Sequence, residues 1–160
     1  MAAQRPKRTA APSPKRILLA TDFSPYADTA LRWADAVSKA FGAKLIIVHA
    51  LDLTLGGLAG LAPEVAAFPV ADQLVDRLRE EAKKEMAHLA KRLPRAQTVI
   101  REGPPRSTLP QVASEVRADL IVVGTQGRTG LAHMLIGSVA EHLVRHSRIP
   151  VLTVRLAEPA

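Results

Sequence analysis

The chain has 160 residues, 48% of them hydrophobic, no cysteine and a formal net charge of +7. This length and apolar content suit one ordinary domain with a buried core. The lack of cysteine excludes disulfides and thiolate metal sites and fits a reducing compartment. No stretch approaches the roughly 18 consecutive apolar residues of a membrane span, and the first residues lack the apolar core of a secretory signal. We therefore expect a cytoplasmic protein.

Most of the basic excess lies at the start of the chain. Five basic residues and no acidic residue occur between 1 and 16, which leaves the rest of the chain a net charge of only +2. Prolines among small and charged residues predict a disordered tail over residues 1–14. A nucleic-acid-binding arm is one interpretation, but an aromatic content of 3% leaves few rings for base stacking. A solubilising arm is therefore favoured, and residues 157–160 are expected to form a second short tail.

The first ordered elements are a strand and a helix. The apolar run RILLA predicts a strand over residues 16–20. Ser24 followed by Pro25 predicts a helix start, because a serine hydroxyl caps free amides and proline suits the first helical position. Gly42 is expected to end this helix as its C-cap. Trp33 lies off the apolar stripe of the helix, either exposed or in contact with a partner. The stripe recurs at three and four residues and consists of Ala27, Ala30, Leu31, Ala34, Val37 and Phe41.

The next segment, KLIIVHA, predicts a second strand over residues 44–50. Its continuous branched apolar residues are typical of a strand covered on both faces of a parallel sheet. Residues 51–69 are rich in glycine and leucine and predict a long loop, either a lid or a segment that packs on another surface such as a second subunit. Residues 70–93 then show the apolar spacing of a long amphipathic helix.

The remaining elements complete an alternating order. Strands are expected at 96–101, 119–123 and 150–154. A helix of about a dozen residues, with Leu109, Val112, Ala113 and Val116 inward, precedes the strand at 119–123, and a helix at 138–147 follows it. This alternation predicts one α/β domain over residues 15–156, a doubly wound parallel sheet with helices on both faces. Ligands bind such sheets beyond the C-terminal ends of the strands.

One of these strand ends carries the glycine-rich segment GTQGRTGLAHMLIGS, residues 124–138. It is neither a Walker A loop nor the GxGxxG dinucleotide fingerprint, which should follow the first strand. Glycines let a backbone approach a ligand closely, and successive amides can form an anion nest. A helix that begins after Gly137 would favour negative charge, and Arg128 could add a phosphate contact.

Ser138 has two interpretations. Its hydroxyl could contact a bound phosphate, or it could form a capping box with Glu141, three residues further along. The residues alone therefore leave open an anion site and a capped structural loop.

Several segments together resemble the universal stress protein family: ILLATDFS, VHA, REGPP, and GTQGRTG with LIGSVAEHLV and IPVLTVR. The resemblance covers residues 15–156, and the spacing of Gly124, Gly127 and Gly137 before Ser138 is the mark of the ATP-binding branch of the family. It implies a five-stranded sheet of order 3-2-1-4-5 that binds ATP, with Mg²⁺ carried on the phosphates.

The resemblance also implies site residues. Asp22 matches an acidic residue near the adenosine and is the candidate magnesium carboxylate, with helix capping as its structural alternative. Ala50 matches a position whose backbone reads the adenine edge. Ala20 stands where some ATP binders carry proline, and Gln126 where histidine is frequent, but both departures leave the expected backbone nest intact. The expected ATP-binding residues are Ala20, Thr21, Asp22, Ala50, Gly124, Gly127, Arg128, Gly130, Gly137, Ser138 and Val139.

The family's fifth strand pairs antiparallel with that of a second chain, so the resemblance implies a homodimer. An apolar edge strand suits this arrangement because self-pairing closes an edge that would otherwise invite aggregation. The expected dimer residues are Pro150, Val151, Leu152, Thr153 and Val154.

The histidines do not predict a metal site made of protein ligands alone. His49 ends a buried strand and is interpreted as structural, and His133, His142 and His146 are scattered over helical segments.

The leading hypothesis is a homodimeric ATP-binding regulatory protein of the stress response. No catalytic residues are assigned, because only Gln126 stands near enough to orient a water at the γ-phosphate, so any hydrolysis should be slow. The alternatives are a nucleotide-free interaction module of the same fold, a cyclic AMP sensor that uses the same loop, and an adenylyl transferase.

Overall fold

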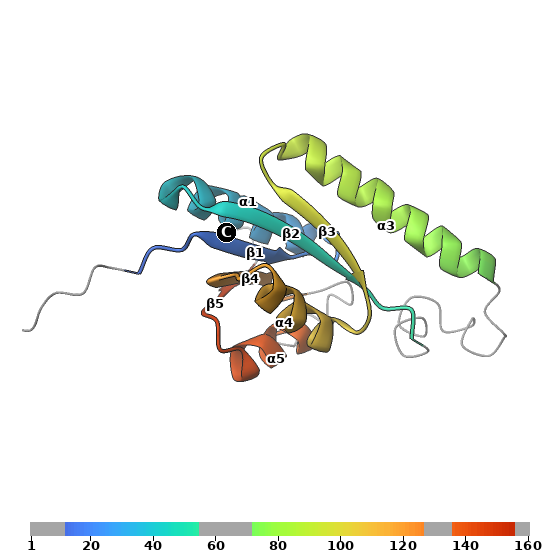
Figure 1. Cartoon of the computed structure of the whole chain (residues 1–160). Coiled ribbons are helices and arrows are strands. Elements are labelled where there is room, and N and C mark those ends of the chain that lie inside the picture. The colour runs from blue at the N-terminus through green and yellow to red at the C-terminus, as the bar shows by residue number, and fades with distance from the viewer. Residues whose placement is uncertain (1–11, 55–71, 127–135, 156–160) are drawn as a thin grey trace, which may run out of the picture.

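The computed structural model describes residues 12–54, 72–126 and 136–155. Its five strands form one parallel sheet in the order β3-β2-β1-β4-β5, as the resemblance implied (Figure 1). Residues 55–69 of the expected long loop and residues 70–71 of the expected helix after it lie outside the described residues, as do residues 1–11 and 157–160 of the expected tails. The strands are β1 (Arg16–Ala20), β2 (Lys44–Leu51), β3 (Gln97–Glu102), β4 (Leu120–Gly124) and β5 (Val151–Val154).

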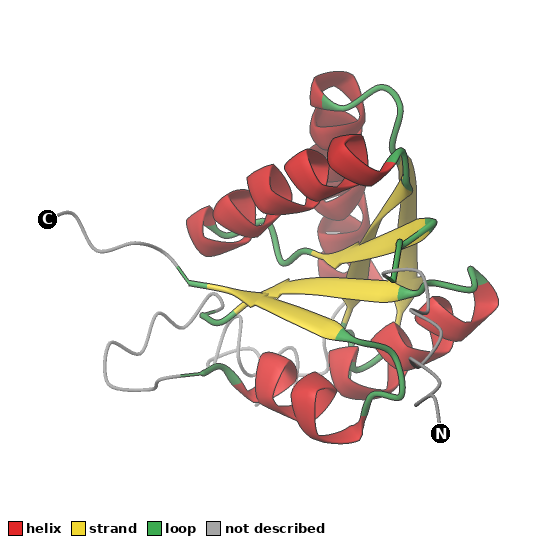
Figure 2. Cartoon of the chain, turned by 90° about the vertical axis from the view of Figure 1, so that its left-hand side faces the viewer, coloured by secondary structure: helices red, strands yellow, loops and turns green. Residues whose placement is uncertain are grey.

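Helices cover both faces of the sheet (Figures 1 and 2). Helices α1 (Pro25–Phe41) and α3 (Asp72–Arg92) pack on one face, and helices α4 (Pro105–Glu115) and α5 (Ser138–His146) pack on the other. The predicted doubly wound α/β fold is therefore confirmed. Each predicted strand and helix is present, with ends within two residues of those expected.

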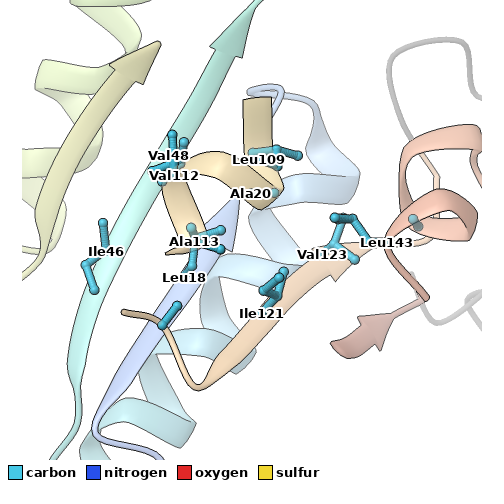
Figure 3. Packing of buried hydrophobic residues seen from close by; sticks show 12 residues of the cluster. Leu18, Ala20, Ile46, Val48, Leu109, Val112, Ala113, Ile121, Val123 and Leu143 are labelled. Carbon is cyan, nitrogen blue, oxygen red and sulfur yellow. The ribbon is translucent and has the colours of Figure 1, made fainter. Parts of the chain in front are cut away.

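The central position of β1 in the sheet explains why its sequence is apolar without alternation. Ile17 and Leu19 point into the core beneath α1 and α3, whereas Leu18 and Ala20 point into the core beneath α4 and α5. Successive side chains of a strand face opposite sides of the sheet. Because helices cover both sides here, alternate residues pack into two different hydrophobic cores. Figure 3 shows the α4 and α5 side of this packing.

Helix α1 begins and ends where the sequence predicts. The Ser24 hydroxyl accepts a hydrogen bond from the Ala27 amide at 3.2 Å, and Gly42 takes the left-handed conformation, with φ of 62°. Trp33 is exposed in the single chain, which fits both of its interpretations. Phe41, however, is 47% exposed, so the buried stripe ends one turn earlier than its spacing predicts. As the last helical residue before the turn, Phe41 has less of the sheet to pack against.

Candidate functional site

A cavity of about 280 Å³ opens at the carboxyl ends of β1 and β4, beside the first turn of α5. Parallel α/β sheets bind ligands at this position, because the loops there diverge to opposite faces. Eight expected site residues line the cavity, namely Ala20, Thr21, Asp22, Ala50, Gly124, Gly137, Ser138 and Val139. The other three, Gly127, Arg128 and Gly130, lie outside the described residues.

The TDFS turn after β1 forms one wall. The Thr21 amide donates to the Val48 carbonyl at 2.9 Å, which continues the β1–β2 pairing past the end of β1. The Asp22 carboxylate accepts from the Ser24 amide at 3.0 Å and so orders the turn before α1, whereas the cap of the helix itself is the Ser24 hydroxyl. Phe23 has a left-handed backbone with φ of 62°, an uncommon state for a residue with a side chain. A strained, internally bonded turn therefore fixes Asp22 at the cavity.

His49 holds this turn from behind. It is buried, and its Nδ1 donates to the Thr21 carbonyl at 2.8 Å. Its ring also packs against Phe23, with ring centroids 4.3 Å apart. The structural interpretation of His49 is confirmed: the residue ties the end of β2 to the turn that carries Asp22.

The opposite wall is the amino terminus of α5, and here one interpretation of Ser138 is wrong. The N-cap is Gly137, with an extended backbone and no side-chain cap, so Ser138 is the first helical residue. Glu141 does not reach back to form a capping box but accepts a hydrogen bond from Arg145 Nε at 3.0 Å. The Gly137 amide instead donates to the Thr125 carbonyl, which docks this end of the helix onto the end of β4.

This start of α5 leaves donors for a ligand. The first intrahelical bond runs from the Glu141 amide to the Gly137 carbonyl at 2.9 Å. The amides of Ser138, Val139 and Ala140 therefore have no acceptor within the helix. Among the described residues, none accepts from these amides or bonds to the exposed Ser138 hydroxyl. The helix dipole adds partial positive charge at the same point.

Two glycines at the cavity lie where the backbone of a neighbouring segment approaches closely. A Cβ at Gly137 would lie 3.1 Å from the Thr125 carbonyl oxygen, and a Cβ at Gly124 would lie 3.3 Å from the Tyr26 carbonyl oxygen. These glycines therefore let β4, α1 and α5 converge at the cavity. The sequence predicted these glycines for a different reason, namely that they let the backbone approach a bound ligand closely.

Sequence reasoning missed part of the lining. Pro105 and Leu109 from α4 form an apolar wall, and only the position of REGPP after the third strand could have indicated it. An apolar wall with a few convergent polar groups is the usual form of a small-molecule pocket. Gln126, which the sequence placed near the γ-phosphate, also lines the cavity, and the further lining residues that were not expected are Ala27, Val123 and Ala140.

The cavity offers little for a metal ion on its own. Asp22 carries the only carboxylate among the described lining residues. Within residues 12–54, 72–126 and 136–155, no three His, Cys, Asp or Glu side chains are grouped so as to hold a metal ion. Such a donor set suits Mg²⁺ bound mainly by phosphates and waters.

None of the described helices is long and apolar enough to span a membrane.

Fold and cavity together define an α/β protein with a doubly wound parallel sheet and a small-molecule pocket at its carboxyl edge. A sequence profile described as the Universal stress protein family matches residues 14–155, and the chain belongs to this family. The family resemblance drawn from the sequence motifs is confirmed.

Individual relatives agree with this assignment. Universal stress protein MJ0577 of Methanocaldococcus jannaschii is 32% identical over 155 residues, which cover 88% of this chain and 94% of the relative. A universal stress protein of Thermus aquaticus is 33% identical over 143 residues, 88% of this chain and 98% of that protein.

Solved structures share the fold. The structure of MJ0577 superposes with a TM-score of 0.75 at 30% identity and covers 91% of this chain and 98% of its own. A universal stress protein in complex with cAMP superposes with a TM-score of 0.57 at 28% identity, with 89% of this chain and 98% of that chain covered.

Proposed function

We propose that this protein is a regulatory nucleotide-binding protein of the stress response that binds ATP in the cavity and works as a homodimer. The observation that carries the proposal is the pairing of two unlike walls. The free amides and hydroxyl at the start of α5 suit phosphate oxygens, and the apolar wall from α4 and β4 suits a planar base. The cytoplasmic location expected from the sequence remains a prediction.

Each wall of the cavity is expected to contact a different part of the ligand. The amides of Ser138 and Val139 and the Ser138 hydroxyl would donate to the phosphates, and the Ala50 backbone would face the adenine edge. Asp22 would hold Mg²⁺ riding on the phosphates, where the ion would offset their negative charge. Gly127, Arg128 and Gly130 stay predicted phosphate binders that lie outside the described residues.

Hydrolysis is proposed to be slow at most. Phosphoryl transfer to water needs a group that orients the water and charge stabilisation around the γ-phosphate. Among the described lining residues, Asp22 and Gln126 are the only polar side chains long enough to take part, and Asp22 already accepts from Ser24. A slow ATPase therefore fits these walls better than an efficient enzyme does.

A second candidate function is cyclic AMP binding in the same cavity. The specific observation that favours it is the similar universal stress protein solved in complex with cAMP. Cyclic AMP has a single phosphate, so it would use the amides of α5 without the donors expected for a triphosphate.

Isothermal titration calorimetry with ATP, ADP, AMP and cyclic AMP, with and without Mg²⁺, tests the proposal. We expect micromolar ATP binding that weakens about tenfold or more in Ser138→Ala, because a hydrogen bond to a charged group contributes about 1.5–3 kcal/mol. Ser114→Ala, at an exposed serine of α4, is the matched control and should leave the affinity unchanged. Tighter binding of cyclic AMP than of ATP would support the second candidate, and no heat with any nucleotide would refute both.

A further inference from the structure

We propose that the homodimer is held by more than strand pairing: the exposed apolar flanks of α1 and α5 close over the β5 edge of a second copy, with Trp33 as the main anchor. This inference rests on the proposed homodimer and adds the residues that make it stable. We call the set the edge surface. It consists of Trp33 and Val37 of α1, Val151, Leu152 and Thr153 of β5, and Val144 of α5.

Helix α1 presents its apolar flank toward β5. Its other flank faces α3, because Asp28 accepts a hydrogen bond from Arg92 of α3 at 2.7 Å. A rotation of about 100° per residue puts Trp33 and Val37 on the opposite flank, with the buried Ala30 between the two sides. On this face of the sheet α3 contacts β2 and β3, whereas α1 contacts β2 as well as β1, β4 and β5. Because α1 contacts β4 and β5 and α3 does not, the flank away from α3 lies toward the β5 edge.

Helix α5 does the same on the other face. Val139 lines the cavity together with Pro105 and Leu109 of α4, so this side of α5 faces α4. Val144 lies about 140° further around the helix, beyond the buried Leu143. Its side chain is 51% exposed on the flank that borders β5.

These positions form a pattern. Among the described residues, the large hydrophobic side chains that remain exposed are Trp33, Phe41 and Val144, and all three belong to the two helices that border β5. Scattered exposed hydrophobic residues are normal, whereas residues gathered at one edge mark an interaction site.

The backbone of β5 offers hydrogen bonds along the same edge. The Pro150 and Val154 carbonyls accept from the Ile121 and Thr125 amides at 2.9 and 2.8 Å, so this set of alternate residues faces β4. Val151 and Thr153 therefore point their amides and carbonyls away from β4. No described strand lies beyond β5 to pair with them.

A second copy of the chain is the occupant that fits both features. An antiparallel pair of β5 strands about a two-fold axis can place Val151 opposite the partner's Thr153, which pairs all of these outward groups. A two-fold axis perpendicular to the sheet keeps α1 of both copies on the same face, so the two apolar flanks meet over the two Leu152 side chains.

Interface area explains why the helix flanks are needed. A stable interface buries about 800 Å² per partner. The strand has only four residues, which cannot supply that area by themselves. A tryptophan side chain can bury about 150–250 Å², so Trp33 is the largest single contribution that the edge surface offers.

The chain contains one tryptophan, so its fluorescence reports on Trp33 directly. We would record the emission maximum and acrylamide quenching of the full-length protein across a dilution series, with sedimentation equilibrium on the same samples. The expected result is a blue shift and reduced quenching that follow the dimer fraction. Trp33→Ala should weaken dimerisation at least tenfold. Lys39→Ala, on the α3 side of the same helix, should leave it unchanged.

The outcomes separate this inference from the proposed function. A dimer whose Trp33 emission does not change on dilution, and whose affinity survives Trp33→Ala, would overturn the edge surface and leave the homodimer standing. A single-chain mass at every concentration would overturn the edge surface and the homodimer together, while nucleotide calorimetry would still decide the ligand. Protection of Trp33 only when another protein is added would overturn the second copy as its occupant.

Discussion

The sheet formed by the described residues has two edge strands, β3 and β5, and the two strands differ in whether they carry charged residues. β3 ends in Arg101 and Glu102, and both are paired: Arg101 with Glu115 of α4 and Glu102 with Arg79 of α3, each at 2.6 Å. β5 reads VLTV and has no charged residue. Charges on an edge strand oppose pairing with another chain, because pairing would remove them from water. This contrast supports the proposal that a second copy pairs with the β5 edge and not with the β3 edge.

Helix α1 repeats the contrast on its two flanks. The flank toward α3 carries Asp28, which bonds to both Arg32 and Arg92. The flank toward β5 carries the exposed Trp33. One flank is thus ionic and covered by a helix of the same chain, whereas the other is apolar and open, which supports the proposed contact with a second copy.

The largest expected effect comes from a proline placed at equivalent positions of the two edges. The Gly103 amide bonds to Leu51 of β2, and the Val154 carbonyl accepts from Thr125 after β4. Since alternate residues of a strand face the same neighbour, the amides of Thr98 in β3 and Thr153 in β5 both point away from the neighbouring strand. Thr153→Pro removes donors that the dimer uses, so its dissociation constant should rise by at least about 100-fold, since each lost hydrogen bond contributes about 1 kcal/mol and proline also disturbs the pairing. Thr98→Pro should leave the dimer unchanged.

Sedimentation equilibrium of the two variants measures this difference, and circular dichroism checks that both fold. Equal effects of the two prolines on the dimer would mean that the edges are not distinct and that subunits associate elsewhere.

Local sequence signals were enough for most of the fold. Ser24 and Gly42 each act within one turn of their own helix, so their roles as caps could be predicted without knowledge of the tertiary structure. The continuous apolar runs of β1 and β2 likewise indicated strands covered on both faces, and the residues are buried on both sides. The order of the strands came from the family resemblance, because periodicity does not say which strands are neighbours.

The site could be predicted only in part, because contacts distant in sequence complete it. Ser138 and Glu141 have the spacing of a capping box, but the bond between Gly137 and Thr125 sets the helix start one residue earlier. Pro105 and Leu109 reach the cavity because α4 packs on β2 and beside α5, a placement that no local pattern encodes.

A smaller effect is expected from the ionic flank of α1. The hydrogen bond from Arg92 lowers the pKa of Asp28 below its ordinary value of 3.8, against the opposing effect of partial burial. The charged carboxylate thus stabilises the fold above that pH, and the contribution is lost as the pH falls through the lowered pKa. Asp28→Asn should reduce the free energy of unfolding by about 0.5 kcal/mol at pH 7, and the difference from wild type should vanish in strong acid.

Urea unfolding at pH 7 and at pH 2.5 measures this difference. Asp35→Asn, whose carboxylate bonds to Lys39 within α1, is the control for a charge that does not join two helices. A deficit for Asp28→Asn that persisted unchanged in acid would show that the charge pair is not its cause. The dimer affinity should be the same in both variants, because neither residue belongs to the edge surface.

The smallest expected effect lies at the β3 edge. Arg79 donates to both Glu102 oxygens, at 2.6 and 3.2 Å, and this hydrogen bonding lowers the pKa of Glu102 from its ordinary value of 4.5. Arg79→Gln should therefore raise the pKa of Glu102 toward 4.5, as followed by NMR titration of its carboxyl carbon. Because both side chains are exposed, stability should change little. The unpaired Glu102 would still be charged at pH 7 and would still oppose strand pairing, so the variant should remain a dimer and form no larger assembly. An unchanged pKa would show that the pair does not form in solution, and growth beyond the dimer would show that the pair, rather than the charge itself, keeps the β3 edge single.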